Sequence, residues 1–521
     1  MKNKLHAFLF LLTSITGFSQ TLDPTFGTNG KVITHISDDQ DAITSIALQP
    51  DGKIVASGMS RELGEFRTLV CRYNADGSLD TSFGTNGKVV FNELFHESIN
   101  CKLKLQSDGK IVIATNKGDF EFNYNFMLVR LNNDGSYDSG FGNNGVVITD
   151  FETGTASNIV RSIELQPDGK IILGGECSGN DGTGSQYENF AIARYNTDGS
   201  LDSGFGTNGK VSINIGSNSI SSYSIDGIYS VKLQSSGKII LAGYTDAQNS
   251  IEVYNAALVR LNTDGTIDTA FGTNGKTITS FPVASAGIGS IVINSDDSIV
   301  AGEIVGFGSN DNTKIDILKY DANGNLDTSF GTNGRTITQV NATAMRDTIW
   351  EMALQPDGKI LATGYSVNAT IDMVLLRYTA SGILDTTFDG DGILLTDFNN
   401  TADGSYALLV QPDGKIVVGG LSGLNPNYEF ALARYTFENL NISNPESKGL
   451  KIYPNPVKSI LNIQNAGNAV IKKTTVTDVT GKKIIEQEAV SQLNVESLTP
   501  GIYFLELDYE GGKQTEKFIK Q

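Results

Sequence analysis

Phe83-Gly84-Thr85-Asn86-Gly87-Lys88 is one of seven nearly identical elements, and this element decides the fold of the chain. The element recurs at spacings of 57 to 66 residues, and its last copy is degenerate. The copies begin at Phe26, Phe83, Phe141, Phe205, Phe271, Phe330 and Phe388. A fixed long period indicates one supersecondary unit that stacks on itself and buries its apolar faces against its neighbours.

Each unit contains four short segments rich in β-branched or aromatic residues, for example residues 88–91, 100–106, 110–115 and 126–131. Pro-Asp-Gly or a related turn joins the second segment to the third, because proline presets φ and glycine accepts a positive φ. Four antiparallel strands in each of seven units predict an all-β chain with a seven-bladed β-propeller. An open β-solenoid is the alternative, but it needs shorter repeats and capping units.

The two ends of the repeat array complement each other. The first copy has no preceding Arg-Tyr strand, and the last unit ends at Ala433-Arg434-Tyr435 with no Asp-Gly linker after it. We therefore expect the ends to meet at one seam and close the ring, which removes edge strands that would otherwise aggregate.

Alternating strand direction places the repeated loops on one face and the variable loops on the other, which we call the repeated face and the variable face. Variable loops on a rigid scaffold are where binding usually resides, so we predict a binding surface on the variable face and at the mouth of the central channel. The predicted binding residues are aromatic: Phe120, Tyr187, Tyr223, Tyr254 and Trp350. The alternative is that these residues only complete the blades.

Composition excludes several classes of function. The net charge of -19 repels phosphate backbones, so we expect no nucleic-acid partner. Three widely spaced cysteines provide no disulfide framework, and Cys71 and Cys101 fall in predicted strands, where a buried free thiol is the expected state. Beyond the leader, His35 and His96 are the only histidines, and neither has a metal-ligand or nucleophile spacing. No catalytic residue is selected, and spacing singles out no carboxylate pair for glycoside chemistry.

The repeated Asp-Gly loops resemble fragments of calcium loops, because alternating oxygen side chains around a glycine turn can wrap a hard cation. Calcium is therefore the only cofactor that we consider. Its predicted ligands are Asp76, Asp80, Asp134, Asp138, Asp321, Asn323, Asn325 and Asp327. The alternative is an Asx-type turn, with Leu79 and Phe83 packed between blades.

The ends of the chain predict export. Residues 1–20 carry two lysines, an apolar core and a small polar end, which is typical of a secretory signal peptide. No later segment reaches about 18 uninterrupted apolar residues, so we expect no transmembrane segment in the mature chain. The predicted order is a signal peptide (1–20), the propeller (21–436), a linker (437–449) and a small immunoglobulin-like β-sandwich (450–521).

The last segment carries four motifs in a fixed order, and their main residues are Tyr453, Pro454, Asn455, Pro456, Gly481, Gly501 and Tyr503. In these motifs it resembles the type A C-terminal sorting domain of type IX secretion. The resemblance implies that the type IX secretion machinery is a partner and that the protein reaches the cell surface or the medium. An ordinary carbohydrate-binding sandwich is the alternative.

The units between residues 22 and 435 resemble the delta-60 repeat of large exported bacterial proteins. The resemblance implies a propeller-like scaffold and leaves the ligand open. We expect an exported binding or adhesion scaffold for an extracellular glycan or protein. An enzyme acting on extracellular glycans is the first alternative, and a compact carboxylate cluster at one channel mouth would distinguish it. A calcium-stabilised surface protein is the second alternative.

Overall fold

The computed structural model describes residues 19–62, 65–95, 101–118, 123–151, 157–180, 186–216, 224–246, 254–280, 286–305, 313–438, 450–465, 471–478, 482–488, 490–509 and 512–521. The expected signal peptide up to residue 18, most of the expected linker, and Phe120, Tyr223 and Gly481 lie outside these residues. The chain divides into two compact units, Met1–Asn439 and Leu440–Gln521. Among the described residues, no helix has the length and apolar character needed to cross a membrane.

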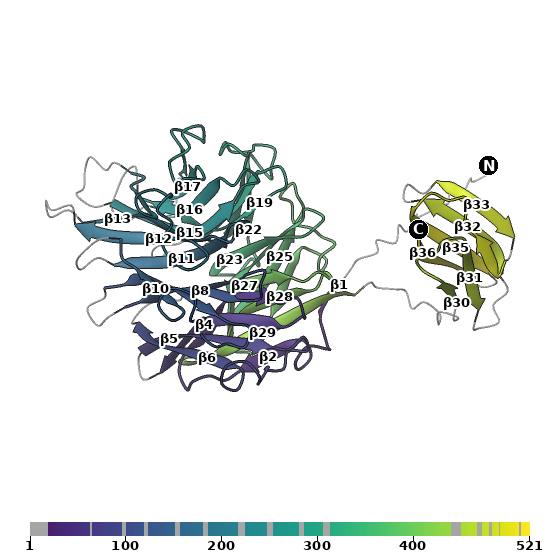
Figure 1. Ribbon diagram of the computed structural model, residues 1–521, viewed down its shortest axis with the longest axis horizontal. Coiled ribbons are helices and arrows are strands. Elements are labelled where there is room, and N and C mark those ends of the chain that lie inside the picture. The colour runs from purple at the N-terminus through teal and green to yellow at the C-terminus, as the bar shows by residue number, and fades with distance from the viewer. Residues whose placement is uncertain are drawn as a thin grey trace, which may run out of the picture. The chain divides into compact units, whose positions relative to one another are not determined.

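The first unit is a β-propeller whose blades are numbered here along the chain (Figure 1). Blade 1 contains β3 (Asp41–Leu48), β4 (Ile54–Glu62), β5 (Glu65–Tyr73) and β6 (Lys88–Phe95). Blade 2 contains β7 (Lys102–Leu105), β8 (Ile111–Lys117), β9 (Asn125–Leu131) and β10 (Val146–Thr149). Blade 3 contains β11 (Asn158–Leu165), β12 (Ile171–Asn180), β13 (Gln186–Tyr195) and β14 (Lys210–Ile213). Blade 4 contains β15 (Ser224–Leu233), β16 (Ile239–Thr245), β17 (Asn255–Leu261) and β18 (Lys276–Thr279). Blade 5 contains β19 (Ala286–Ile293), β20 (Ile299–Val305), β21 (Ile315–Tyr320) and β22 (Arg335–Thr338). Blade 6 contains β23 (Arg346–Leu354), β24 (Ile360–Val367), β25 (Ile371–Tyr378) and β26 (Ile393–Thr396).

Blade 7 confirms the expected ring closure. Its first three strands are β27 (Ala402–Val410), β28 (Ile416–Leu424) and β29 (Asn427–Glu438). Its outer edge is formed by β1 (Ser19–Leu22) and β2 (Lys31–Thr34), which come from the other end of the repeat array. Both N-terminal strands pair with β29 in antiparallel register, for example Val32 with Leu432 (Figure 1). The innermost strands of successive blades pack against one another in sequence, and β27 packs against β3, so the ring is complete.

The expected grouping of strands was wrong by one position. Residues 88–91 were expected to begin a unit, but β6 pairs with β5 and forms the outer edge of the preceding blade. The segment after the Phe-Gly element therefore completes one blade, and the chain then crosses to the inner strand of the next. The division into two faces does not change, because it depends only on alternating strand direction.

Apolar side chains from adjacent blades form a shared core at each interface. Phe83, from the repeated loop of blade 1, is fully buried among residues of blades 1 and 2, including Val55 and Ile113. Buried tyrosines of the Arg-Tyr motif also bond across blade boundaries, as where Tyr195 Oη lies 2.7 Å from Thr149 Oγ1 of the preceding blade. Cys71, Cys101 and Cys177 are buried free thiols, which confirms the expectation for the first two.

The second unit contains two small sheets around one core. Its strands are β30 (Leu450–Tyr453), β31 (Ile460–Asn465) and β34 (Gln492–Asn494) in one sheet, and β33 (Lys483–Glu488), β32 (Ile471–Asp478), β35 (Gly501–Tyr509) and β36 (Gly512–Lys520) in the other. Both sheets contribute to a core that includes Leu461, Leu493, Leu505 and Phe518.

Candidate ligand site at the channel mouth

On the repeated face, three of the predicted calcium residues, Asp80, Asp138 and Asp327, belong to a belt of ion pairs. Asp80 accepts hydrogen bonds from Arg72 Nε at 2.7 Å and from Ser82, and Lys53 Nζ lies 3.0 Å away. The guanidinium of Arg72 also covers the ring of Phe83 and donates to the backbone carbonyl of Asn133 in the next blade. The same arrangement recurs at Arg130–Asp138–Lys110, Arg194–Asp202–Lys170, Arg260–Asp268–Lys238, Arg377–Asp385–Lys359 and Arg434–Asp23–Lys415. The arginine donates to a backbone carbonyl of the next blade from Arg72, Arg130, Arg194, Arg260 and Arg434, so the motif fastens these five blades to their neighbours.

The exposed Asp-Gly loops form the Asx-type turns that were the alternative to calcium. Asp76 accepts from the backbone N–H and the hydroxyl of Ser78 at 2.9 and 2.6 Å. Asp134 makes the same two bonds with Ser136, and Asp321 accepts from the backbone of Asn323 and Asn325. Protein donors therefore use oxygens that a cation would need. These contacts support the turn interpretation, and calcium binding here stays a prediction.

A further acidic group lies at the boundary of blades 6 and 7, where Asp372, Asp397 and Asp403 bring carboxylate oxygens within 4.8 Å of one another. Asp403 is fully buried, and it accepts from Phe398 N at 2.6 Å and from the Thr401 hydroxyl at 2.8 Å. Its oxygens thus hold the turn that precedes β27.

The innermost strand of each blade forms part of the channel wall, and most of these strands carry a bulge. These innermost strands are β3, β7, β11, β15, β19, β23 and β27. In six of them the register with the next strand shifts by one residue, so two residues oppose one and a single residue of the strand is bypassed. The bypassed residues all line one cavity of about 390 Å³: Thr44, Arg161, Tyr229, Gly289, Trp350 and Tyr406. Each lies six residues before the first residue of the following hairpin turn. This spacing is a sequence signal that could have found them.

Aromatic rings concentrate in this wall. Trp350 lies in β23, whereas sequence analysis placed it at the end of a variable loop, and its ring contacts Tyr406 edge to face with centroids 5.6 Å apart. The guanidinium of Arg161 lies 4.8 Å from the centroid of the Tyr229 ring. The half-buried wall therefore combines apolar ring surface with a fixed cation.

A group of charged residues lies between blades 3 and 4, on the side of the variable face. Arg161 donates to the Glu176 carboxylate through Nη2 at 2.8 Å and Nε at 3.2 Å, and the Tyr244 hydroxyl donates to the same carboxylate at 3.1 Å. Gly227 leaves the space for this contact, since an added Cβ would lie 2.5 Å from a Glu176 oxygen and 2.6 Å from the Tyr244 ring.

Glu188 joins this group from β13. The register of β12 and β13 pairs Ser178 with Glu188 and Glu176 with Phe190, so the two glutamates are diagonal neighbours on one face of the sheet. Burial, together with the negative charge of Glu176, raises the pKa of Glu188 to about 7. Glu188 thus changes protonation near neutral pH, whereas Arg161 holds Glu176 in a charged pair.

Two of the predicted aromatics lie beside this group. Tyr254 contacts Tyr244 with ring centroids 5.2 Å apart, and Tyr187 precedes Glu188 on β13. The structure thus brings Tyr187 and Tyr254 to the boundary of blades 3 and 4 and Trp350 into the channel wall. Sequence analysis missed Arg161 and Tyr229, which the bulge spacing could have found. It also missed Glu176 and Glu188, for which the sequence holds no such signal, because the face to which a strand residue points depends on the register of the strand.

Seven segments of the chain match a family model, and they fall at the hairpins and repeated loops described above. They are residues 49–83, 106–141, 166–205, 234–271, 295–330, 355–388 and 411–436. The chain carries a seven-repeat DUF5122 β-propeller. The family is described as a domain of unknown function, so the match establishes the propeller and assigns no activity. The delta-60 designation stays an interpretation.

Solved structures resemble the chain at low identity. A protein of unknown function from Dyadobacter fermentans shares 12% identity with a TM-score of 0.41, covering 80% of this chain and 100% of that one. A polysaccharide lyase, Uly1, shares 10% with a TM-score of 0.44, covering 79% and 92%. The β-propeller domain of the Trilobed protease from Pyrococcus furiosus shares 9% with a TM-score of 0.38, covering 75% and 95%. Such likenesses carry no argument about activity. The search of curated proteins found no match.

Residues 451–521 match the family described as secretion system C-terminal sorting domain. This domain marks the protein for export by type IX secretion to the cell surface or the extracellular space. Its motif residues have distinct positions. Tyr453 is exposed at the end of β30, Asn455 Oδ1 accepts from Ile519 N at 2.9 Å, and Tyr503 stacks on Phe518 in the core. Gly501 begins β35.

Proposed function

We propose that the propeller is the recognition part of this exported protein and that it binds an extracellular saccharide at the mouth of the central channel. One observation carries the proposal: Tyr229, Trp350 and Tyr406 converge on a single cavity of about 390 Å³. Aromatic rings offer flat apolar surfaces that suit the apolar faces of sugar rings. The volume falls within the roughly 300–1,000 Å³ typical of small-molecule sites. Binding of a surface polymer in this way would make the protein an adhesion scaffold.

The test uses the intrinsic fluorescence of Trp350, the only tryptophan in the chain. Full-length protein is titrated with a panel of neutral and acidic tetrasaccharides. We expect a saturable change in emission with at least one member of the panel, and weaker binding in Tyr229→Ala. Tyr137→Ala is the matched control, because Tyr137 is 39% exposed in a repeated loop. Equal loss in both variants, or no saturable change with any saccharide, would contradict the proposal.

A second candidate function is cleavage of a glycosidic bond, and the Glu176–Glu188 pair favours it. Glycoside hydrolysis uses two carboxyl groups, one that donates a proton to the leaving oxygen and one that is ionised. Glu188, with its pKa raised to about 7 by burial and by Glu176, suits the first role. Glu176, paired with Arg161, suits the second. The enzyme alternative requires a compact carboxylate cluster at a channel mouth, and the two glutamates support it because Glu176 pairs with Arg161 of the channel wall.

Release of reducing ends from a polysaccharide panel tests the second candidate. Glu188→Gln should abolish release, and Asp413→Asn, on an exposed hairpin of the repeated face, should leave it unchanged. Saturable binding without release would retain the recognition function and remove the enzymatic one.

A further inference from the structure

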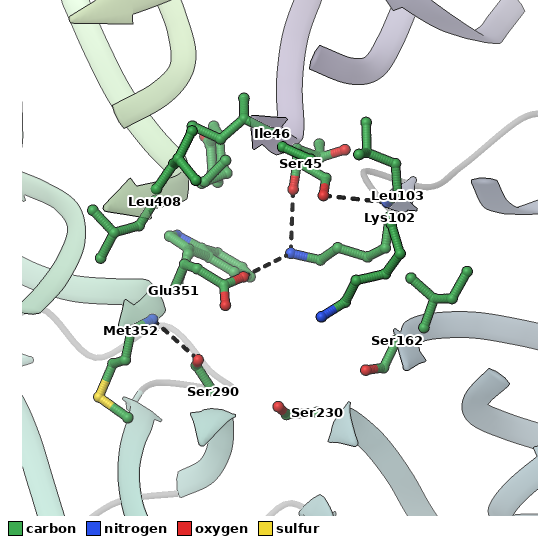
Figure 2. A pocket seen from close by; sticks show the side chains of 18 of the residues that line it. Ser45, Ile46, Lys102, Leu103, Ser162, Ser230, Ser290, Glu351, Met352 and Leu408 are labelled. Carbon is green, nitrogen blue, oxygen red and sulfur yellow. Dashed lines mark hydrogen bonds and ion pairs between the residues drawn. The ribbon is translucent and has the colours of Figure 1, made fainter. Parts of the chain in front are cut away.

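Three lysines from two inner strands project into the channel. Lys102 Nζ lies 3.2 Å from Glu351 on the far side of the cavity (Figure 2), and it also donates to the backbone carbonyl of Thr44. Lys104 and Lys232 share a single carboxylate, Glu164, at 3.2 and 3.7 Å. Three ammonium groups thus have two carboxylates between them. Each is still partly accessible, with side-chain exposures of 25%, 35% and 28% for Lys102, Lys104 and Lys232.

The lysines act on one another and on the same region of the cavity. Burial lowers the pKa of Lys104, and the positive charge of Lys232 lowers it further. Burial alone would raise the pKa of Glu351, but the charges of all three lysines bring it below its usual value. The channel therefore holds excess positive charge inside a chain whose net charge is -19. Concentrated positive charge attracts an anion, and dissolved salt screens this attraction least where solvent is excluded.

A purely structural role for these lysines is the alternative, and the serines of the wall bear on it. Ser45, Ser162, Ser230 and Ser290 each accept a hydrogen bond from a backbone N–H of the next blade, at 3.0 to 3.3 Å. Lys102 and Glu351 occupy the equivalent positions of their own strands, and they pair across the cavity (Figure 2). Serines thus link neighbouring blades through the backbone, whereas the lysines line the cavity, where Lys102 pairs with Glu351 across the lumen. Lys104 and Lys232 pair with Glu164 of the blade between them.

We propose that the lysine cluster formed by Lys102, Lys104 and Lys232 receives an acidic group of the ligand, so that the ligand is an anionic saccharide bearing carboxylate or sulfate. The inference rests on the proposed binding of a saccharide at the channel mouth. The aromatic wall contacts the sugar rings, and the lysines bind the anion as point charges. Arg161 is already engaged by Glu176, which leaves the lysines as the cations with unsatisfied charge. Glu351 competes with the ligand anion for Lys102.

Calorimetric titration of full-length protein with matched saccharides tests this inference. The probes are tetragalacturonate, its neutral methyl ester, and a sulfated galactan tetrasaccharide with its desulfated form. Lys104→Gln and Lys232→Gln should weaken binding of an acidic probe by about tenfold, since a charge-assisted hydrogen bond contributes about that factor, and should leave neutral binding unchanged. Glu351→Gln should tighten binding of the acidic probe, because it frees Lys102. Lys314→Gln, at an exposed lysine, is the charge-matched control and should change nothing.

The outcomes separate the two proposals. Preference for an acidic probe over its neutral partner, with opposite effects of the lysine and Glu351 variants, would establish the inference, and the preferred probe would identify carboxylate or sulfate. Equal binding of acidic and neutral probes would overturn the inference and retain saccharide binding. Binding of no saccharide would overturn both. If a lysine variant fails to fold, the direction of the Glu351→Gln effect still decides, since a purely structural ion pair predicts no gain in affinity.

Discussion

Replacing Asp23 by asparagine tests how the ring is held closed. Asp23 lies at the seam between the two ends of the repeat array, and its Oδ2 accepts from Arg434 Nε at 2.9 Å and from Lys415 Nζ at 3.1 Å. Its Oδ1 accepts from the backbone and the hydroxyl of Thr25 at 3.0 and 2.6 Å. Asp23→Asn keeps the size of the side chain and an acceptor for Thr25, but it removes the negative charge that both cations face.

The expected loss follows from burial. The side chains of Asp23 and Arg434 are only 4% and 6% exposed, so the variant leaves a buried guanidinium without its carboxylate. Breaking a buried pair in this way costs roughly 3–5 kcal/mol. Lys415 is 31% exposed and can regain water, which favours the lower end, about 3 kcal/mol.

The loss should also depend on pH. Burial alone would raise the pKa of Asp23, but hydrogen bonds from Thr25 and Lys415, with the charge of Arg434, lower it to about 2. A carboxyl whose folded pKa is depressed stabilises the protein above its unfolded pKa, near 4, and this contribution is lost as the pH falls toward the folded value. The difference between Asp23→Asn and wild type should therefore shrink between about pH 4 and pH 2.

Urea unfolding followed by Trp350 fluorescence measures the effect, because the single tryptophan reports on the propeller and is absent from the second unit. Asp413→Asn is the matched control, since Asp413 pairs with the same Lys415 at 3.7 Å but is 57% exposed. It should change stability by less than about 0.5 kcal/mol. Equal and small losses in both variants would refute the view that the Asp23 ion pairs hold the seam.

Four further outcomes are expected. Glu188→Gln should stabilise the propeller by about 2 kcal/mol at pH 8 and hardly at pH 4, as urea midpoints at both pH values would show. Burial and the charge of Glu176 raise the pKa of Glu188 in the folded protein to about 7. The wild-type protein therefore loses stability as the pH rises from the pKa of Glu188 in the unfolded chain through about 7. Tyr195→Phe should cost about 1 kcal/mol by removing the bond to Thr149, and an unchanged urea midpoint would contradict this. A chelator should leave the thermal midpoint unchanged if the Asp-Gly loops are Asx turns, whereas a clear drop would support calcium. Deletion of residues 451–521 should retain the protein inside the cell, as cell fractionation would show, and export of the truncated chain would contradict a sorting role.

The propeller could be predicted from sequence because its determinants are local and repeated. Proline and glycine turns mark the hairpins. Because the unit occurs seven times, its pattern stays recognisable despite exceptions such as Asp296 and Asp297 in place of Asp-Gly. The position of residues 88–91 within a blade could not be predicted, because a strand between two units has the same sequence character whichever neighbour it joins. Only the pairing of Val89 with Val70 decides that β6 closes blade 1.

The channel could be predicted as the place of a candidate site, but the extent of its lining could not, since the cavity reaches Leu48 and Leu409 beside the hairpins of the repeated face. Alternating strand direction is enough to separate variable loops from repeated ones, and Trp350 was selected as one of the aromatics expected on the variable face. Arg161 and Glu176 are 15 residues apart and meet only because β11 and β12 pair around a bulge. Lys102 and Glu351 come from blades 2 and 6, and only ring closure brings them face to face.

The most direct test of ligand binding at the channel mouth is hydroxyl-radical footprinting of full-length protein with and without a saturating acidic tetrasaccharide. Oxidation should fall at Tyr229, Trp350 and Tyr406, which line the channel wall, and should stay unchanged at the exposed Tyr137 of the repeated face. Protection of Tyr137, or undiminished oxidation of the three channel residues at saturation, would show that the ligand binds elsewhere.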